Sequence, residues 1–208
     1  MIPKWIQRIR HSRGYGVHSP FAFNLITSII NDENAYYAFF DIDNILFTQG
    51  IEQTNKKLNH LSYRLLMHLK SDNALEIGSA NNTNTFYIAS ALQGNTCYFV
   101  DEMKTVNEDK KALIKEHYNN VEFISKPKKE RKYYSIFIAP KHTDITPEEL
   151  FYLSDENCFW VVSGIKSGAG KHFWKKTVID KQANVTLEMK DIGIAFINSE
   201  LSKRHYFI

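Results

Sequence analysis

Residues 74–85 read Ala74-Leu75-Glu76-Ile77-Gly78-Ser79-Ala80-Asn81-Asn82-Thr83-Asn84-Thr85. The first four residues are typical of a short buried strand that ends at Gly78. Asn82 or Thr83 is suited to cap a following helix, because such side chains accept hydrogen bonds from the free N–H groups of a helix start. A strand that turns at a glycine into a helix is the unit with which open α/β sheets bind nucleotide-like ligands.

Strand-like and helix-like segments alternate on both sides of this unit. The pattern predicts an α/β fold with a mainly parallel sheet and helices on both faces. Strands are expected at 74–77, 97–100, 121–124, 134–138 and 158–162, and helices at 58–69, 85–92, 106–118, 147–153 and 171–183. Three extended stretches follow at 185–189, 193–197 and 205–208, and two of them are expected to form an antiparallel hairpin.

We divide the chain into a helical N-terminal extension, 1–55, and an α/β domain, 56–208. Ser19-Pro20 starts a predicted helix, because Pro is favoured in the first turn. Residues 39–47 are apolar but contain two aspartates, and their pattern does not decide between helix and strand. Lys4, Arg8, Arg10 and Arg13 alternate with apolar residues. This segment is expected to pack on its own domain or on a second subunit, so a homodimer is left open.

Composition excludes several functional classes. A hydrophobic fraction of 43% and a net charge of +3 are ordinary for a globular protein and give little reason to expect nucleic acid or membrane as the main partner. The basic segment 126–132 is interpreted as a solvated loop. Cys97 and Cys158 provide neither a disulfide framework nor zinc-ligand spacing. With no signal-peptide pattern and no long apolar run, we expect a reduced, cytoplasmic compartment.

The second predicted strand ends at Asp101, roughly 20 residues after Gly78, where an acid is placed to accept hydrogen bonds from ribose hydroxyls. The alternative is purely structural, with Glu76 capping a helix and Asp101 merely ending a strand. A dinucleotide ligand and nucleic-acid binding through the basic segments remain further alternatives.

The residues around Gly78 also resemble a known family. Leu75 to Asn82 is similar to the first motif of class I S-adenosylmethionine-dependent methyltransferases, acidic-x-Gly-x-Gly-x-Gly. Phe99-Val100-Asp101 is similar to the second motif, and 133–138 to the fourth strand. The resemblance covers about residues 56–198. The opening 13–21 resembles an O-methyltransferase-like group of Bacteroidetes-type bacteria.

The resemblance implies a Rossmann-like sheet of seven strands with the last one antiparallel. It also implies S-adenosylmethionine as cofactor and a small-molecule acceptor, with hydroxyl as the expected methyl-accepting group. The residues implied to hold the cofactor are Glu76, Gly78, Ser79, Ala80 and Asn82 near its methionine end, and Asp101 or Glu102 at its ribose.

The chain departs from the family pattern at two points. Ala80 and Asn82 replace the second and third glycines of the first motif, so cofactor binding is weakened or lost. The metal-dependent O-methyltransferase branch carries aspartates after the fourth and fifth strands, where this chain has Ala139-Pro140 and Ser163-Gly164. Two oxygen ligands for a divalent cation are missing, and we expect no catalytic metal.

Other candidate residues have weaker support. His18 and His142 are considered as general bases, although a structural histidine is the simpler interpretation of each. Residues 164–172 do not match the phosphate-loop pattern and are expected to border an acceptor pocket. Two functions follow: a metal-independent methyltransferase, or a catalytically inactive protein of the same fold that serves as a binding or assembly module.

Overall fold

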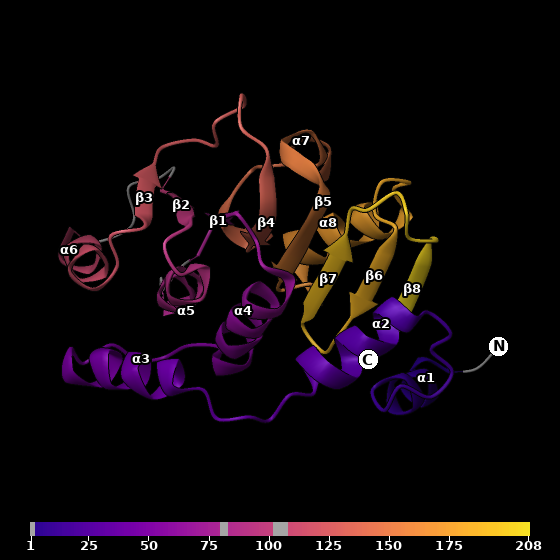
Figure 1. Cartoon of the computed structure of the whole chain (residues 1–208). Coiled ribbons are helices and arrows are strands. Elements are labelled where there is room, and N and C mark those ends of the chain that lie inside the picture. Colours follow the sequence, from indigo (N-terminus) through magenta and orange to yellow (C-terminus); the bar gives the residue numbers. More distant parts are fainter. Residues whose placement is uncertain (1–2, 80–82, 102–107) are drawn as a thin grey trace.

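The computed structural model describes residues 3–79, 83–101 and 108–208 (Figure 1). Its centre is an eight-stranded sheet in the order β3-β2-β1-β4-β5-β7-β6-β8. The strands are β1 (Asn73–Ile77), β2 (Thr96–Val100), β3 (Val121–Ile124), β4 (Tyr133–Ile138), β5 (Ser154–Ser163), β6 (Val185–Glu188), β7 (Ile192–Phe196) and β8 (Arg204–Phe207).

The sheet is mainly parallel, as predicted. Strands β1 to β5 pair in parallel, and β7 is antiparallel to both of its neighbours, β5 and β6. The predicted C-terminal hairpin is therefore the β6–β7 pair. The expected number of seven strands is one too few, because β8 adds to the edge and runs parallel to β6, with Tyr206 beside Leu187.

Helices cover both faces of the sheet, as the alternating pattern predicts. One face packs against α4 (Lys56–Leu69), α5 (Thr83–Leu92) and α6 (Glu108–His117). The other face packs against α7 (Pro147–Leu153) and α8 (Gly168–Ile179). Strand β1 is buried along its whole length because both faces are covered. Cys97 and Cys158 are fully buried.

The N-terminal extension is helical and joins the same core. It contains α1 (Lys4–His11), α2 (Pro20–Asn24), the π-helix η1 (Leu25–Ile30) and α3 (Tyr37–Thr48). Pro20 begins α2, as the sequence predicts, and the Ser19 hydroxyl accepts a hydrogen bond from the Ala22 backbone. The segment 39–47, undecided from its pattern, lies within α3, with Ile42 and Leu46 buried toward α4 and α5.

In the described part of the chain, no helix has the length and apolar composition needed to span a membrane.

Candidate functional site

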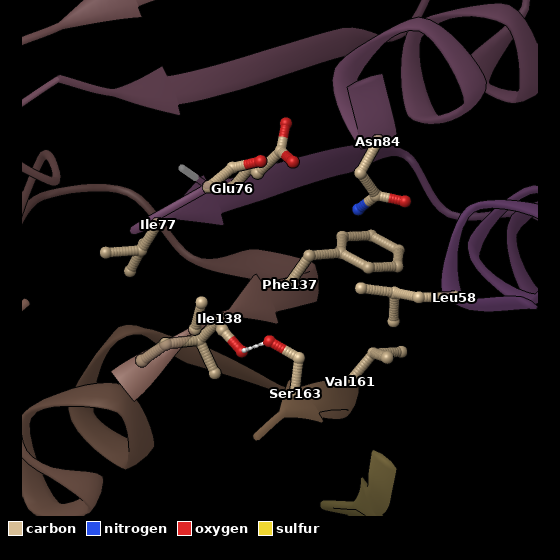
Figure 2. Close-up of a pocket in the computed structure, with 10 residues that line it drawn as sticks. Leu58, Glu76, Ile77, Asn84, Phe137, Ile138, Val161 and Ser163 are labelled. Atoms are coloured by element: carbon tan, nitrogen blue, oxygen red, sulfur yellow. Dashed lines mark hydrogen bonds between the residues drawn. The ribbon is translucent and has the colours of Figure 1, made fainter. Parts of the chain in front are cut away.

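A small cavity lies at the carboxyl ends of three neighbouring strands, β1, β4 and β5 (Figure 2). Its volume is about 40 Å³. The lining residues are Leu58, Glu76, Ile77, Ser79, Asn84, Phe137, Ile138, Ala139, Val161 and Ser163. Figure 2 shows Phe137, Leu58 and Val161 gathered on one side, with Glu76 and Asn84 on the other. The carboxyl end of a parallel sheet is where α/β folds bind ligands.

Glu76 is the most unusual residue of this cavity. Its side chain lies within strand β1 and is 1% exposed. The Thr85 hydroxyl donates to Glu76 Oε2 at 2.7 Å. Burial raises the pKa of the Glu76 carboxyl to about 7, although Thr85, Ser79 and Asn84 oppose the shift. The carboxyl therefore exchanges its proton near neutral pH, which an ordinary structural glutamate does not.

Two buried oxygens at the cavity have no hydrogen-bond partner among the described residues. They are Glu76 Oε1 and Asn84 Oδ1, from strand β1 and from the first turn of α5. Buried acceptors without partners are costly, so they commonly mark a place where a ligand or water supplies the donors. Asn84, which the sequence reasoning did not single out, is 6% exposed and belongs to the site.

Gly78 sits at the turn after β1 with φ of +72°. A Cβ on this residue would lie 2.6 Å from the Ala139 carbonyl oxygen, which is too close. A glycine is required here because the turns after β1 and β4 press against each other. The Ala139 N–H also donates to the Ile77 carbonyl at 3.0 Å. The glycine therefore brings the two strand ends together at the cavity.

Asp101 lies at the end of β2, beside the site, and is 7% exposed. Its carboxylate does not stand open to a ligand. Lys111, one helical turn inside α6, places its ammonium 3.0 Å from Asp101 Oδ2 and also pairs with Glu108 at 2.8 Å. These carboxylates raise the pKa of Lys111, so the ammonium stays charged. A ligand that binds Asp101 must share it with this cation.

Three predicted cofactor residues, Ala80, Asn82 and Glu102, lie outside the described residues. The structure therefore brings together Glu76, Gly78 and Ser79, and adds Asp101 at the next strand end. Three of the four lie on or directly after β1, and the fourth ends the strand paired with it. Their chain positions alone predict this arrangement, since parallel strands end at one edge.

The two histidine candidates lie at different ends of the sheet. His142 follows β4 in a short 3₁₀ turn, and its Cβ would lie 3.4 Å from a Cβ on Gly78. Its side chain is exposed beside the Gly78 turn, and it is not among the residues that line the cavity. His18 lies three residues before Phe21, which packs on Phe196 and lines a pocket with Ser71 and Tyr134, just before β1 and at the start of β4. That is the amino end of the parallel strands, so the structure does not bring His18 to the cavity.

The segment after β5 passes close to the same edge. Ser163 lines the cavity and Gly164 turns the chain with φ of +72°. Lys166 in this segment pairs with Glu188 at 2.8 Å instead of pointing its charge at the cavity. Among the described residues, no His, Cys, Asp and Glu side chains gather as a metal-binding group. The expectation of a metal-independent site remains a prediction.

No protein-family model and no curated protein matches the sequence. Solved structures do match the fold. An O-methyltransferase from Bacillus cereus in complex with SAH superposes with a TM-score of 0.57 at 12% identity, covering 85% of this chain and 96% of that chain. TomG is a SAM-bound O-methyltransferase from Streptomyces achromogenes involved in tomaymycin synthesis. It superposes with a TM-score of 0.54 at 13% identity, covering 80% of this chain and 92% of that chain.

A methyltransferase from Geobacter sulfurreducens gives a TM-score of 0.60 at 10% identity, covering 81% of this chain and 92% of that chain. At identities this low, a structural match shows the fold and does not show the activity. The mainly parallel sheet, the antiparallel β7 and the helices on both faces agree with the Rossmann-like fold that the sequence resemblance implies. The chain therefore has the Rossmann-like fold of SAM-dependent O-methyltransferases.

Proposed function

We propose that this chain is an S-adenosylmethionine-dependent methyltransferase that acts on a hydroxyl group of a small molecule without a metal ion. The observation that carries the proposal is the buried Glu76 carboxyl, which has one unpartnered oxygen at the cavity beyond Gly78. Structural cores rarely keep a carboxyl in this state, whereas ligand sites do.

The donors and acceptors of the cavity fit one end of this cofactor. Glu76 Oε1 and Asn84 Oδ1 are both acceptors without donors among the described residues. The ammonium of an amino-acid moiety supplies several N–H donors and a positive charge. An adjacent cation favours the ionised form of Glu76, so binding would lower the pKa of that carboxyl from about 7. Asp101 would accept hydrogen bonds from ribose hydroxyls.

The cofactor supplies an electrophilic methyl group on a sulfonium when it is bound. The chain's own residues would then bind and orient the two reactants. Leu58, Phe137 and Val161 give the cavity an apolar wall, which would limit the access of water to the reactants. Alignment of the acceptor oxygen with the methyl group would remove a large part of the free-energy barrier to methyl transfer. His142, exposed beside Gly78, is our candidate to take the acceptor proton.

Thermal unfolding with added S-adenosylmethionine or S-adenosylhomocysteine tests the cofactor step directly. At 100 times the dissociation constant a ligand of the native state adds about 2.7 kcal/mol. For a domain of this size that raises the Tm by several degrees, at about 2–4 °C per kcal/mol. Asn84→Ala should abolish the shift because it removes one of the two free acceptors.

Glu156→Gln is the matched control, because this exposed carboxylate lies at the far end of β5 from the cavity. It should keep the full shift. The absence of any shift with either compound at millimolar concentration would contradict the proposal.

A second candidate function is a binding or assembly module without catalysis. The Lys111–Asp101 ion pair favours it, since the ammonium occupies the carboxylate that would hold the ribose. The small volume of the cavity favours it as well. Lys111→Met separates the two candidates. If the cation blocks the site, only the variant shows a ligand-dependent shift; in an active methyltransferase the wild-type chain shows one too.

A further inference from the structure

A second and larger cavity lies at the opposite end of the sheet from the candidate site. We call it the amino-end pocket, and its walls include Phe21 of α2, Leu69 at the end of α4, Tyr134 of β4, Phe159 of β5 and Phe196 of β7. Its volume is about 200 Å³, compared with about 40 Å³ for the cavity near Glu76. An apolar cavity of roughly 150 Å³ is large enough to bind benzene. The amino-end pocket therefore has room for one aromatic ring and a small substituent.

The inner wall of the amino-end pocket is apolar and mostly aromatic. Phe159 and Phe196 are 3% and 5% exposed, and the Phe21 ring packs edge-on against Phe196 with 4.9 Å between the ring centroids. Leu69 and Leu201 complete this wall. Aromatic rings favour edge-on and offset contacts with other rings. The wall is therefore suited to a planar aromatic ring.

The rim of the amino-end pocket is polar and is held in place by hydrogen bonds. The buried Ser71 hydroxyl lies 2.7 Å from the Asn73 carbonyl oxygen and 2.9 Å from the Ser135 hydroxyl. On the other side of the rim, the Asn198 amide donates to Asn157 Oδ1 at 2.8 Å. Pockets for small molecules are usually formed before the ligand arrives. These bonds give the rim a fixed shape without closing the cavity.

Three side chains of the rim have hydrogen-bond donors that are not used within the described residues. They are the Lys70 ammonium, the Tyr134 hydroxyl and the Asn157 side-chain N–H groups. The nearby carboxylates of Asp155 and Asp72 raise the pKa of Tyr134, so this hydroxyl keeps its proton and remains a donor. A ligand that meets all three groups needs acceptor atoms, and two carboxylate oxygens provide them.

The charge at the rim also favours an anion. Lys70 is the only charged side chain among the described residues that line the pocket. Asp72, Asp155 and Glu156 act on Tyr134 but do not line the pocket, so solvent screens their effect on a ligand. We propose that the amino-end pocket binds a small aromatic carboxylate, with its ring against the phenylalanines and its carboxylate at Lys70.

The amino-end pocket is distinct from the candidate site, although the two are neighbours. Phe137 lines the cavity near Glu76 and packs edge-on against Phe159 of the amino-end pocket, with 6.0 Å between the ring centroids. The two cavities share no lining residue within the described part of the chain. Binding in the amino-end pocket therefore does not depend on the proposed methyl transfer.

Fluorine NMR titration of the full chain with three matched probes tests the proposal. The probes are para-fluorobenzoate, para-fluorobenzamide and para-fluorobenzylamine, which share one ring and differ in the charge of its substituent. The benzoate should bind with a dissociation constant of about 1 mM or less. It should bind about tenfold more tightly than the benzamide, because hydrogen bonds to a charged group are the stronger ones. The benzylamine should bind no more tightly than the benzamide.

Two variants test the position of the ligand. Lys70→Gln should weaken benzoate binding about tenfold and leave benzamide binding unchanged, because it removes only the charge. Lys175→Gln is the matched control, since this exposed lysine lies on α8 at the other face of the sheet, and it should change neither. Leu201→Trp fills the cavity and should abolish the binding of both probes. Asn84→Ala, at the cavity near Glu76, should leave the binding of both unchanged.

Four results would overturn the proposal. The first is no binding of the benzoate up to about 10 mM, and the second is a benzylamine that binds more tightly than the benzoate. The third is a benzoate affinity that neither Lys70→Gln nor Leu201→Trp reduces. The fourth is a benzoate affinity that Asn84→Ala reduces, which would assign the probe to the cavity near Glu76.

Discussion

At the scale of single residues, Glu76 carries the most information. Its pKa rises from 4.5 to about 7 because the carboxyl is buried. Between these two pH values the folded chain holds a proton that the unfolded chain has lost. The stabilisation from the protonated carboxyl is therefore complete below pH 4.5 and is lost as the pH rises through 7. Integrated over this range, it amounts to about 3 kcal/mol.

Glu76→Gln removes this pH dependence, because the amide remains neutral. We expect the variant to match the wild type near pH 4 and to exceed it by up to about 3 kcal/mol in free energy of unfolding at pH 8. Urea unfolding at a series of pH values measures the difference, with Glu156→Gln as a control for the loss of one exposed carboxylate. Parallel pH profiles for wild type and Glu76→Gln would contradict the raised pKa.

The sequence predicts the positions of Glu76 and Asp101 well, because both lie at the ends of readable strands. It does not predict what surrounds them. The Lys111 ammonium reaches Asp101 from another element, α6, and nothing in the local pattern of either segment indicates the pair. The sequence does not indicate Asn84 as a site residue, because an asparagine in the first turn of a helix is common. Only the packing of α5 on β1 leaves its side-chain oxygen at the cavity.

At the scale of elements, α3 explains why some segments are hard to assign. Its apolar residues point both inward and outward, so no amphipathic period stands out, and Asp41 and Asp43 interrupt the run. The aspartates prove to have different places: Asp41 is exposed, whereas Asp43 anchors α3 to α5 through Tyr87. Tertiary contacts thus decide the state of a segment whose pattern leaves it open.

The anchor between α3 and α5 predicts a sizeable cost for a single hydroxyl. Tyr87 is fully buried, donates to Asp43 and accepts from Gln53. Tyr87→Phe leaves the carboxylate and the amide without this partner, so we expect a loss of about 1–3 kcal/mol in chemical unfolding. Tyr63→Phe is the control on neighbouring α4, where the ring packs on Phe39. If Tyr87→Phe lowers the free energy of unfolding no more than the control does, the Tyr87–Asp43 hydrogen bond does not anchor α3 to α5.

At the scale of the whole molecule, the alternating pattern of strands and helices predicts the parallel part of the sheet but not the position of its edge strand β8. Strands β1 to β5 follow from local patterns and the rule that such units build parallel sheets. The sequence predicts an extended stretch at 205–208, but the place of β8 depends on a return of the chain around β6. There it meets α1, where His11 packs edge-on against Tyr206 and Arg8 pairs with Glu188 at 2.9 Å. The two ends of the chain therefore stabilise each other.

This junction predicts that one residue near the C-terminus supports both α1 and the sheet edge. Tyr206 is 6% exposed, between Leu187 on β6 and His11 on α1. Tyr206→Ala should lower the free energy of unfolding by about 3 kcal/mol, because it leaves a cavity that the edge of the sheet cannot fill. Arg204→Ala, on the same strand but exposed, should change it by less than about 0.5 kcal/mol. Proteolysis should then cut first in α1 of the Tyr206 variant, since that helix loses its support. Equal losses in both variants would mean that β8 contributes only backbone pairing, and the two chain ends would then be stabilised independently.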